Sequence, residues 1–242
     1  MKPGRNEPKI LVANRDLVLP GQALAVGPIR PGDYVYVDKR GVLRSTKVGL
    51  ADIREGEIRV VPLAGSYIPR EGDLVVGTVS KVAGNTILVN INSAYPGVII
   101  PPRGLRGRAR AKYNLSPGDL VLAKVKAFDG VSSPLLSIEG EGLGKLVGGR
   151  VYMINPTRVP RVIGKRQSML MLLKSKLGPE IIVGQNGVIW YNPKSLKHAL
   201  LMEQVLAKIE RESHVSGLSD RVLRLIESSG ILDSQGSEAG EV

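Results

Sequence analysis

The 242-residue chain contains no cysteine, only two histidines, and few aromatic residues: one Trp, one Phe and seven Tyr. Without cysteine, the chain cannot form disulfide bonds, cysteine-ligated zinc sites, iron–sulfur clusters or a catalytic thiolate. No run approaches about 18 consecutive apolar residues, and the N-terminal stretch lacks the apolar core of a signal peptide. We therefore expect a cytoplasmic protein that does not span a membrane.

The sequence also lacks a recognisable catalytic or metal-binding cluster. His198 and His214 lie far from any matching set of ligands, and the carboxylates are scattered along the chain. Glu55 and Glu57 flank a glycine, but no third acidic residue accompanies them. No nucleophile has an evident base, and no pattern resembles a two-metal nuclease. We predict a binding protein with no catalytic residue, no metal and no cofactor.

The balance of charge indicates a polyanionic partner. The chain has 34 Lys or Arg and 22 Asp or Glu, which gives a net charge of +12. Such a surface attracts nucleic acid at long range. A heat-adapted surface or a ribosome-like scaffold could have the same balance. The last twelve residues differ, because they contain three acidic residues and no basic one.

Hydrophobic patterning divides the chain into three parts and a tail. Short runs rich in Val and Ile, separated by Pro-Gly, Gly-Asp and Lys-Arg-Gly turn signals, predict an antiparallel β domain over residues 1–69. Five strands within 70–145, at about 72–79, 86–89, 98–100, 119–127 and 135–138, predict an OB-type barrel. The glycine-rich stretch 140–149 is typical of a linker. Residues 146–230 mix strands with an amphipathic helix at about 195–212, which predicts an α+β domain. Residues 231–242 are expected to be a disordered tail.

The densest cluster of positive charge lies between two strands of the barrel. Five cations occur within ten residues, with no acid among them: Arg103, Arg106, Arg108, Arg110 and Lys112. Guanidinium groups bind phosphates with two parallel hydrogen bonds, and clustering strengthens their combined field. The segment therefore predicts an RNA- or DNA-binding loop, although a merely solvated loop has the same composition.

Two shorter motifs lie in the α+β domain. Gly164 is followed by Lys165 and Arg166 at the start of a helix, where backbone, helix dipole and cations all favour a phosphate. A basic helix start without a ligand is the alternative. Gly184-Gln185-Asn186-Gly187 lies between two strands and has the composition of a plain hairpin turn. Trp190 and Tyr191 follow it and could stack on bases, but the alternation of a strand lets at most one of them face outward.

Taken together, these segments resemble a known family. GDLVVGTV (72–79), GDLVLAKV (118–125) and LSI (136–138) are similar to strands of the OB-fold repeat of ribosomal protein S-one, and VPRVIGKRQ (159–167) is similar to the GXXG segment of a KH domain. With PGQAL, GSYIPREGDLVVGTV and VGQNGVIWYNP, the chain resembles, over about residues 8–228, the RNA-binding cap subunit of the archaeal exosome that ends in a KH domain.

Two positions depart from the family pattern. The barrel segment AGNTILVNI has no aromatic residue, which leaves Tyr95 as the nearby candidate for base stacking. The closing glycine of the KH loop is replaced by Gln167, which would obstruct close approach of a phosphate. The resemblance also suggests Gly184, Gln185, Asn186 and Gly187 as a family signature, either structural or facing RNA.

The resemblance implies a non-catalytic subunit, three copies of which would sit on a ring of RNase PH-like subunits that degrade RNA from the 3′ end by phosphorolysis. The cap would bind single-stranded RNA, the arginine loop would approach the central channel, and the N-terminal β domain would contact the ring. Two alternatives remain at this point: a free-standing translation or transcription factor with the same domains, and a ribonuclease in its own right.

Overall fold

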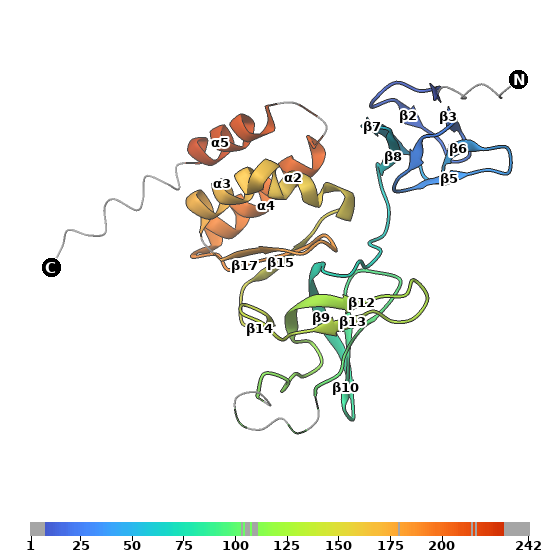
Figure 1. Cartoon of the computed structure of the whole chain (residues 1–242). Helices are drawn as coiled ribbons and strands as arrows, with labels where there is room; N and C mark the ends of the chain where they lie inside the picture. Colours follow the sequence, from blue (N-terminus) through green and yellow to red (C-terminus); the bar gives the residue numbers. More distant parts are fainter. Residues whose placement is uncertain are drawn as a thin grey trace, which may run out of the picture. The chain divides into compact units, whose positions relative to one another are not determined.

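The computed structural model describes residues 8–102, 104, 107, 111–178, 180–213, 215 and 217–229. It separates the chain into two compact units, Met1–Gly65 and Ser66–Val242 (Figure 1). The first unit is the N-terminal β domain, and the second combines the barrel with the α+β domain. The expected tail at 231–242 lies outside the described residues.

The first unit consists of two small four-stranded sheets. One has the order β1 (Lys9–Ile10), β3 (Ala23–Val26), β6 (Val42–Ser45), β5 (Val35–Val37), and the other β2 (Leu17–Val18), β7 (Gly49–Arg54), β8 (Glu57–Pro62), β4 (Arg30–Pro31). All pairings are antiparallel except that of β4 with β8. Their inward side chains, among them Leu24, Leu43 and Ile58, form one buried core. The predicted antiparallel β domain is confirmed.

The turn between β5 and β6 shows how the sequence sets this fold. Asp38 accepts hydrogen bonds from the backbone amides of Arg40 (2.8 Å) and Val42 (3.0 Å) and from Nε of Arg44 (2.7 Å). Gly41 takes a φ of +76°, which glycine adopts without strain. The Asp-Lys-Arg-Gly sequence therefore closes the hairpin through its own carboxylate.

The predicted five-stranded barrel is confirmed in the second unit. Its strands are β9 (Leu74–Ala83), β10 (Thr86–Asn90), β11 (Gly97–Ile99), β12 (Leu120–Ala127) and β13 (Leu135–Ser137). β13 pairs with both β11 and β12, which closes the sheet on itself. Alternate residues of the long strands, such as Val75, Val79 and Val121, fill the interior at 0–1% exposure.

The glycine-rich stretch is not the free linker that its composition indicates. Residues Gly144–Leu146 form β14, which pairs with β12 as a sixth strand. Lys145 also forms an ion pair with Asp119 at 2.7 Å. The glycines allow the positive φ angles around this strand, for example +126° at Gly144, so they shape a packed connection.

The α+β domain has the strand and helix order of the expected KH domain. Its elements are β15 (Arg150–Met153), the 3₁₀ turn η1 (Pro156–Arg158), α2 (Val159–Ile163), the 3₁₀ turn η2 (Lys165–Gln167), α3 (Ser168–Leu177), β16 (Ile181–Val183), β17 (Val188–Tyr191), α4 (Leu196–Arg211) and α5 (Leu218–Ser228). The antiparallel sheet has the order β15-β17-β16. One face of this sheet packs on the helices, through a core that includes Ile189, Val205 and Val222.

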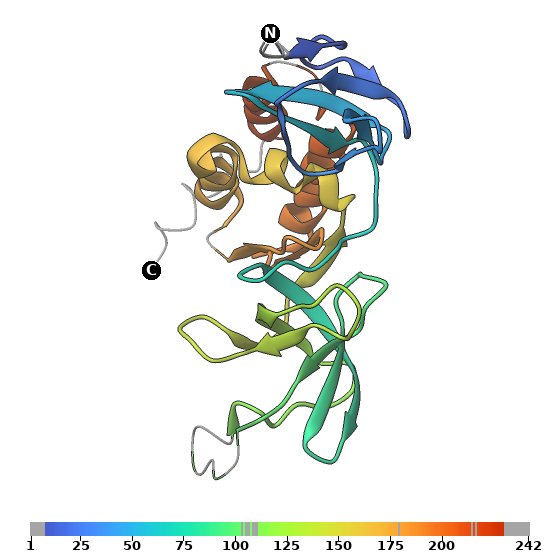
Figure 2. The ribbon, with the colours of Figure 1, turned by 45° about the vertical axis from the view of Figure 1, so that its right-hand side comes forward.

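The opposite face of the KH sheet packs against the barrel. Val188 and Trp190 form a buried cluster with Val76 of β9 and Leu122 of β12. Figures 1 and 2 both show the β15–β17 sheet lying between the helices and the barrel. Trp190 is 6% exposed and Tyr191 1% exposed, so neither side chain is available for base stacking.

Candidate nucleic-acid interface

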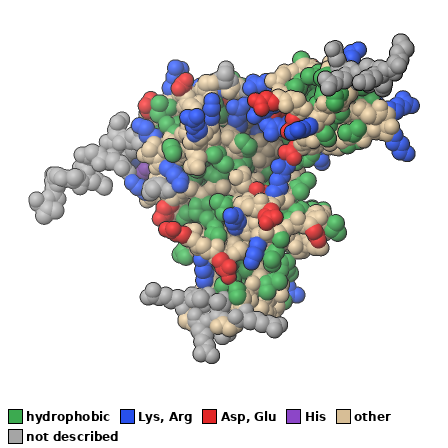
Figure 3. All heavy atoms as spheres, viewed as in Figure 1, with side chains coloured by type: hydrophobic (Ala, Val, Ile, Leu, Met, Phe, Trp, Pro, Cys, Tyr) green, Lys and Arg blue, Asp and Glu red, His purple; other side chains and the backbone are tan. Residues whose placement is uncertain are grey.

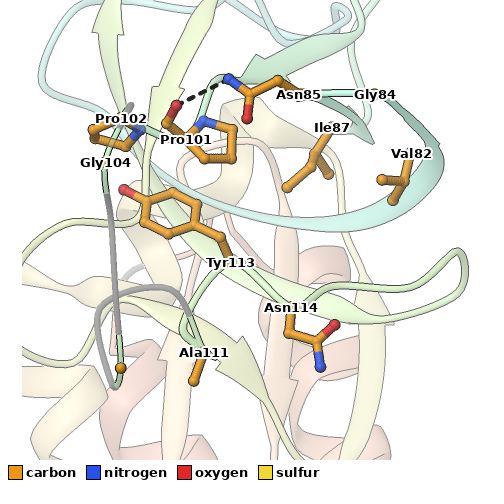
Figure 4. A pocket seen from close by; sticks show the side chains of 11 residues that line it. Val82, Gly84, Asn85, Ile87, Pro101, Pro102, Gly104, Ala111, Tyr113 and Asn114 are labelled. Carbon is orange, nitrogen blue, oxygen red and sulfur yellow. Dashed lines mark hydrogen bonds between the residues drawn. The ribbon is translucent and has the colours of Figure 1, made fainter.

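A pocket of about 800 Å³ is lined in part by the β9–β10 turn. This turn lies at the end of the barrel that points away from the KH domain (Figure 1). Asn85 in the β9–β10 turn, Pro101 and Pro102 after β11, and Tyr113 form much of the pocket wall (Figure 4). Nδ2 of Asn85 donates to the carbonyl of Pro101 at 3.1 Å, which joins two sides of the rim. The pocket thus combines apolar ring surfaces with amide groups, a lining suited to a nucleotide.

The Tyr113 ring lies on the inner side of this pocket. Its hydroxyl donates to a carboxylate oxygen of Glu139 at 3.1 Å. Burial, followed by the neighbouring Glu139 carboxylate, raises the pKa of the Tyr113 hydroxyl. The hydrogen bond holds the partly exposed ring in place, where it can contact a ribose or a base. Sequence patterns contain no signal for Tyr113, because a single tyrosine near a turn is unremarkable.

The predicted arginine loop adjoins the pocket along the chain. Arg103, Arg106, Arg108 and Arg110 lie outside the described residues, but Pro102 and Ala111 on either side of them both line the pocket. Lys112 is described and half-buried, and its ammonium group donates to the carbonyl of Gly140 at 2.9 Å. Lys112 therefore ties this segment to the turn before β14.

Tyr95 has a position fixed by two contacts. Its hydroxyl donates to the carbonyl of Gly130 at 3.1 Å, and its ring meets Phe128 edge-on with centroids 5.0 Å apart. The side chain is half-exposed. Tyr95 thus joins the loop before β11 to the loop between β12 and β13, and the exposed part of its ring remains a candidate stacking surface.

The KH loop places its cations as the sequence indicates. Lys165, Arg166 and Gln167 are all exposed, and neither cation forms an ion pair with any described residue. A Cβ on Gly164, whose φ is +75°, would lie 2.7 Å from the backbone nitrogen of Met169, so glycine is required there. The loop leads into the N-terminus of α3, whose first turn contains no acidic residue. This arrangement favours an anion.

Gln167 adopts the backbone conformation that a glycine would favour. Its φ and ψ are 65° and 16°, and Arg166 is also left-handed with φ of 50°. The replacement of the closing glycine therefore changes the side chain while the loop retains a left-handed turn. Figure 3 shows Lys and Arg side chains gathered over the helical part of the KH domain, where this loop is located.

The turn Gly184–Gly187 forms a joint between the two domains. Nδ2 of Asn186 donates to the carbonyls of Val76 (2.7 Å) and Ile91 (2.9 Å), and its Oδ1 accepts from the amide of Val76 (3.3 Å). Nδ2 of Asn92 donates in turn to the carbonyl of Asn186 at 2.9 Å. Asn186 is 0% exposed, so its side chain cannot reach RNA in this structure.

The other members of this turn serve the same joint. The amide of Gln185 donates to the carbonyl of Leu74 at 2.8 Å, which joins the turn to the first residue of β9. A Cβ on Gly184 would lie 2.9 Å from the amide of Val76, and one on Gly187 would collide with the carbonyl of Ile154. Within the turn, the exposed side chain is that of Gln185. Asn92 also belongs to the joint, and nothing in its sequence context indicates this role.

The described part of the chain has no cluster of three or more His, Cys, Asp or Glu that could hold a metal ion. His198 contacts the helix-capping Ser195, with Nδ1 and Oγ 2.8 Å apart. No helix among the described residues is long and apolar enough to span a membrane.

Comparisons with known proteins match nearly the whole chain. The "Exosome complex component Rrp4" of Thermococcus kodakarensis is 36% identical over 253 aligned residues, covering 96% of this chain and 97% of that protein. The protein of the same name from Pyrobaculum aerophilum is 39% identical, with 93% and 98% covered, and that from Methanobrevibacter smithii is 38% identical, with 88% and 71% covered.

A solved crystal structure, described as that of an exosome complex RNA-binding protein, matches with a TM-score of 0.59 and 34% identity. It covers 68% of this chain and 97% of its own. No family model matches the sequence. The extent and identity of the matches to several archaeal relatives are nevertheless sufficient: the chain belongs to the Rrp4 family of exosome complex components.

Proposed function

We propose that this chain is a non-catalytic, RNA-binding cap subunit of an archaeal exosome, which captures single-stranded RNA and delivers it to a phosphorolytic ring in the cytoplasm. Membership of the Rrp4 family over both units of the chain is the observation that carries this proposal. The net charge of +12, the pocket beside the arginine loop, and the exposed cations of the KH loop support the RNA-binding part.

The RNA surface would consist of two regions. In the barrel, the arginines at 103–110 and Lys112 would contact phosphates, while Tyr113 and Tyr95 would contact sugars or bases. In the KH domain, Gly164 would let the backbone approach the strand, and the two cations that follow it would neutralise its phosphates. Both regions contact mainly the backbone, so we expect weak sequence preference and a strong dependence of affinity on salt.

The N-terminal domain would bind the ring of RNase PH-like subunits through an apolar sheet face. Leu17, Leu50 and Val61 lie opposite one another across β2, β7 and β8. Leu17 is 57% exposed and Val61 45% exposed, whereas Val18 and Val60, which face the other way, are buried. An apolar row on the outer face of a thin sheet indicates a protein contact.

The native complex tests this proposal. Purified from its cells under native conditions, the chain should co-elute with RNase PH-like subunits, with a mass that fits three cap chains per ring. Leu17→Asp should release it from the ring, whereas Val37→Asp, at a similarly exposed valine (49%) of the other sheet, should not. A native chain that co-purifies with ribosomes or RNA polymerase and lacks the ring would contradict the proposal.

A further inference from the structure

The two regions proposed to bind RNA lie at opposite ends of the second unit. β9 runs from the joint, where the carbonyl of Leu74 accepts from Gln185, to the pocket, whose wall includes Val82. Eight steps along a strand, at about 3.3 Å each, correspond to roughly 26 Å. The barrel pocket is therefore separated from the joint by most of the length of β9.

The KH loop lies beyond the joint on the other side. It connects α2 with α3, and residues of these helices, Val162 and Met169, belong to the core on the helical face of the KH sheet. Val188 and Trp190 occupy the opposite face and pack against the barrel. Figures 1 and 2 show this sheet between the helices and the barrel, so the path from the loop to the barrel pocket crosses the joint and follows β9.

The joint keeps this spacing constant. Asn186 is fully buried and forms three hydrogen bonds to barrel backbone, and Asn92 adds a fourth bond across the joint. Nε1 of Trp190 donates to the carbonyl of Gly148 at 3.0 Å, which fixes the connection after β14. Barrel and KH domain are therefore held together as one body, with the barrel pocket on one side of the joint and the KH loop on the other.

We infer that this rigid spacing sets a minimum length for tight RNA binding, a conclusion that depends on the proposed function. A stacked strand advances about 3.4 Å per nucleotide, so a stacked strand that spans 26 Å contains about eight nucleotides. A shorter RNA occupies one region at a time. A longer RNA occupies both, and the second contact then forms within the complex, which strengthens binding by up to about 10²–10⁴-fold. The preferred substrate is a single strand with an unpaired segment longer than this spacing.

The inference is tested with a length series of unstructured single-stranded RNAs of 4 to 24 nucleotides, bound to the full chain at fixed ionic strength. The wild-type affinity should rise gradually up to about eight nucleotides, then increase more than tenfold over a narrow range of lengths.

The KH-loop variant combines Lys165→Asp with Arg166→Asp. A control variant separates the loss of this site from a general loss of positive charge. It combines Lys194→Asp with Lys197→Asp, an equal change of charge on exposed residues near the start of α4.

The KH-loop variant should lose the sharp increase in affinity beyond about eight nucleotides, which we call the step, and keep the gradual rise in affinity among shorter RNAs. The control variant should keep the step. Asn92→Gly, which suits the φ of +55° at this position and removes one bond of the joint, should spread the step over a wider range of lengths. Parallel length curves for the wild type and the KH-loop variant would overturn the inference and leave the proposed function intact. Absence of RNA binding at every length would overturn both.

Discussion

The substitution Asn186→Ala tests whether the joint between barrel and KH domain is a major source of stability. The Asn186 amide pairs with the backbone of Val76 as a neighbouring strand would, and it also binds the carbonyl of Ile91. Alanine leaves the Val76 amide and two buried carbonyls without this partner. A buried polar group that loses its hydrogen bond costs about 1–3 kcal/mol. With partial relaxation, we expect the free energy of unfolding to fall by about 3–5 kcal/mol.

The assay uses the single tryptophan of the chain. Trp190 lies in the same interface at 6% exposure, and its Nε1 donates to the carbonyl of Gly148 in the connection between β14 and β15. Its fluorescence during urea unfolding therefore reports on the joint directly. Gln185→Ala is the matched control, because this neighbouring side chain is exposed and Gln185 reaches the barrel through its backbone amide. The control should change the free energy of unfolding by less than about 0.5 kcal/mol.

Two outcomes would refute this reasoning about the joint. A loss of less than about 1 kcal/mol in Asn186→Ala would mean that water or a shifted backbone satisfies the exposed groups of Val76 and Ile91. An equal loss of unfolding free energy in Gln185→Ala would mean that any substitution in the turn is destabilising. The effect of Asn186→Ala could then not be assigned to its buried side-chain amide. Either result would remove the physical basis of a rigid joint.

Three further predictions concern the RNA surface and the N-terminal domain. Replacing Arg106, Arg108 and Arg110 by alanine should weaken RNA binding and flatten its dependence on salt, as filter binding at a series of salt concentrations would show, and an unchanged slope would exclude the loop. Gln167→Gly should raise the free energy of unfolding by about 0.5–1 kcal/mol, because its φ of 65° strains any other residue, and a lower urea midpoint would contradict this. The Arg44 hydrogen bond, followed by that of the Val42 amide, lowers the pKa of Asp38 from 3.8 to about 2. Its stabilising contribution is therefore complete above about pH 4 and lost as the pH falls toward 2; amide exchange of β5 and β6 should show this loss in the wild type and a flatter profile in Asp38→Asn.

Much of the fold follows from local patterns in the sequence. The Val- and Tyr-rich segment around Val35 and Val37, followed by a Lys-Arg-Gly turn, predicts the β5–β6 hairpin, and the two strands pair as expected. The long apolar strands β9 and β12 and the amphipathic helix α4 are equally evident. The GKRQ loop is predicted because its glycine and cations are adjacent in the chain.

The joint could not be predicted in the same way. Asn186 contacts Val76, which lies 110 residues earlier, and a Gly-Gln-Asn-Gly sequence has the composition of an ordinary turn. The hydrogen bonds of Asn186 require Val76 of β9 and Ile91, just after β10, to lie side by side, and only the folded barrel brings them together. Strand β14 could not be predicted for a related reason. Its glycines indicate a flexible linker, whereas its conformation is determined by pairing with β12. Helix α2 is short and contains Pro160 in its first turn, so its pattern is too brief to recognise.

The last prediction separates RNA binding by this chain from RNA cleavage by the ring. If the chain only binds RNA, the isolated protein should bind a labelled strand without shortening it, in phosphate or in Mg²⁺. Added to the RNase PH-like ring, it should lower the KM for RNA and leave kcat nearly unchanged, because its contacts form with the substrate before the reaction and persist through it.

The triple arginine variant should then raise the KM of the assembled complex by the same factor by which it weakens RNA binding, since a contact that forms before the reaction and persists through it affects binding alone. Single-turnover rates at saturating RNA separate the two effects. If the variant slowed this rate, the arginine loop would be acting on the strand at the reacting end, and delivery alone would not explain its role.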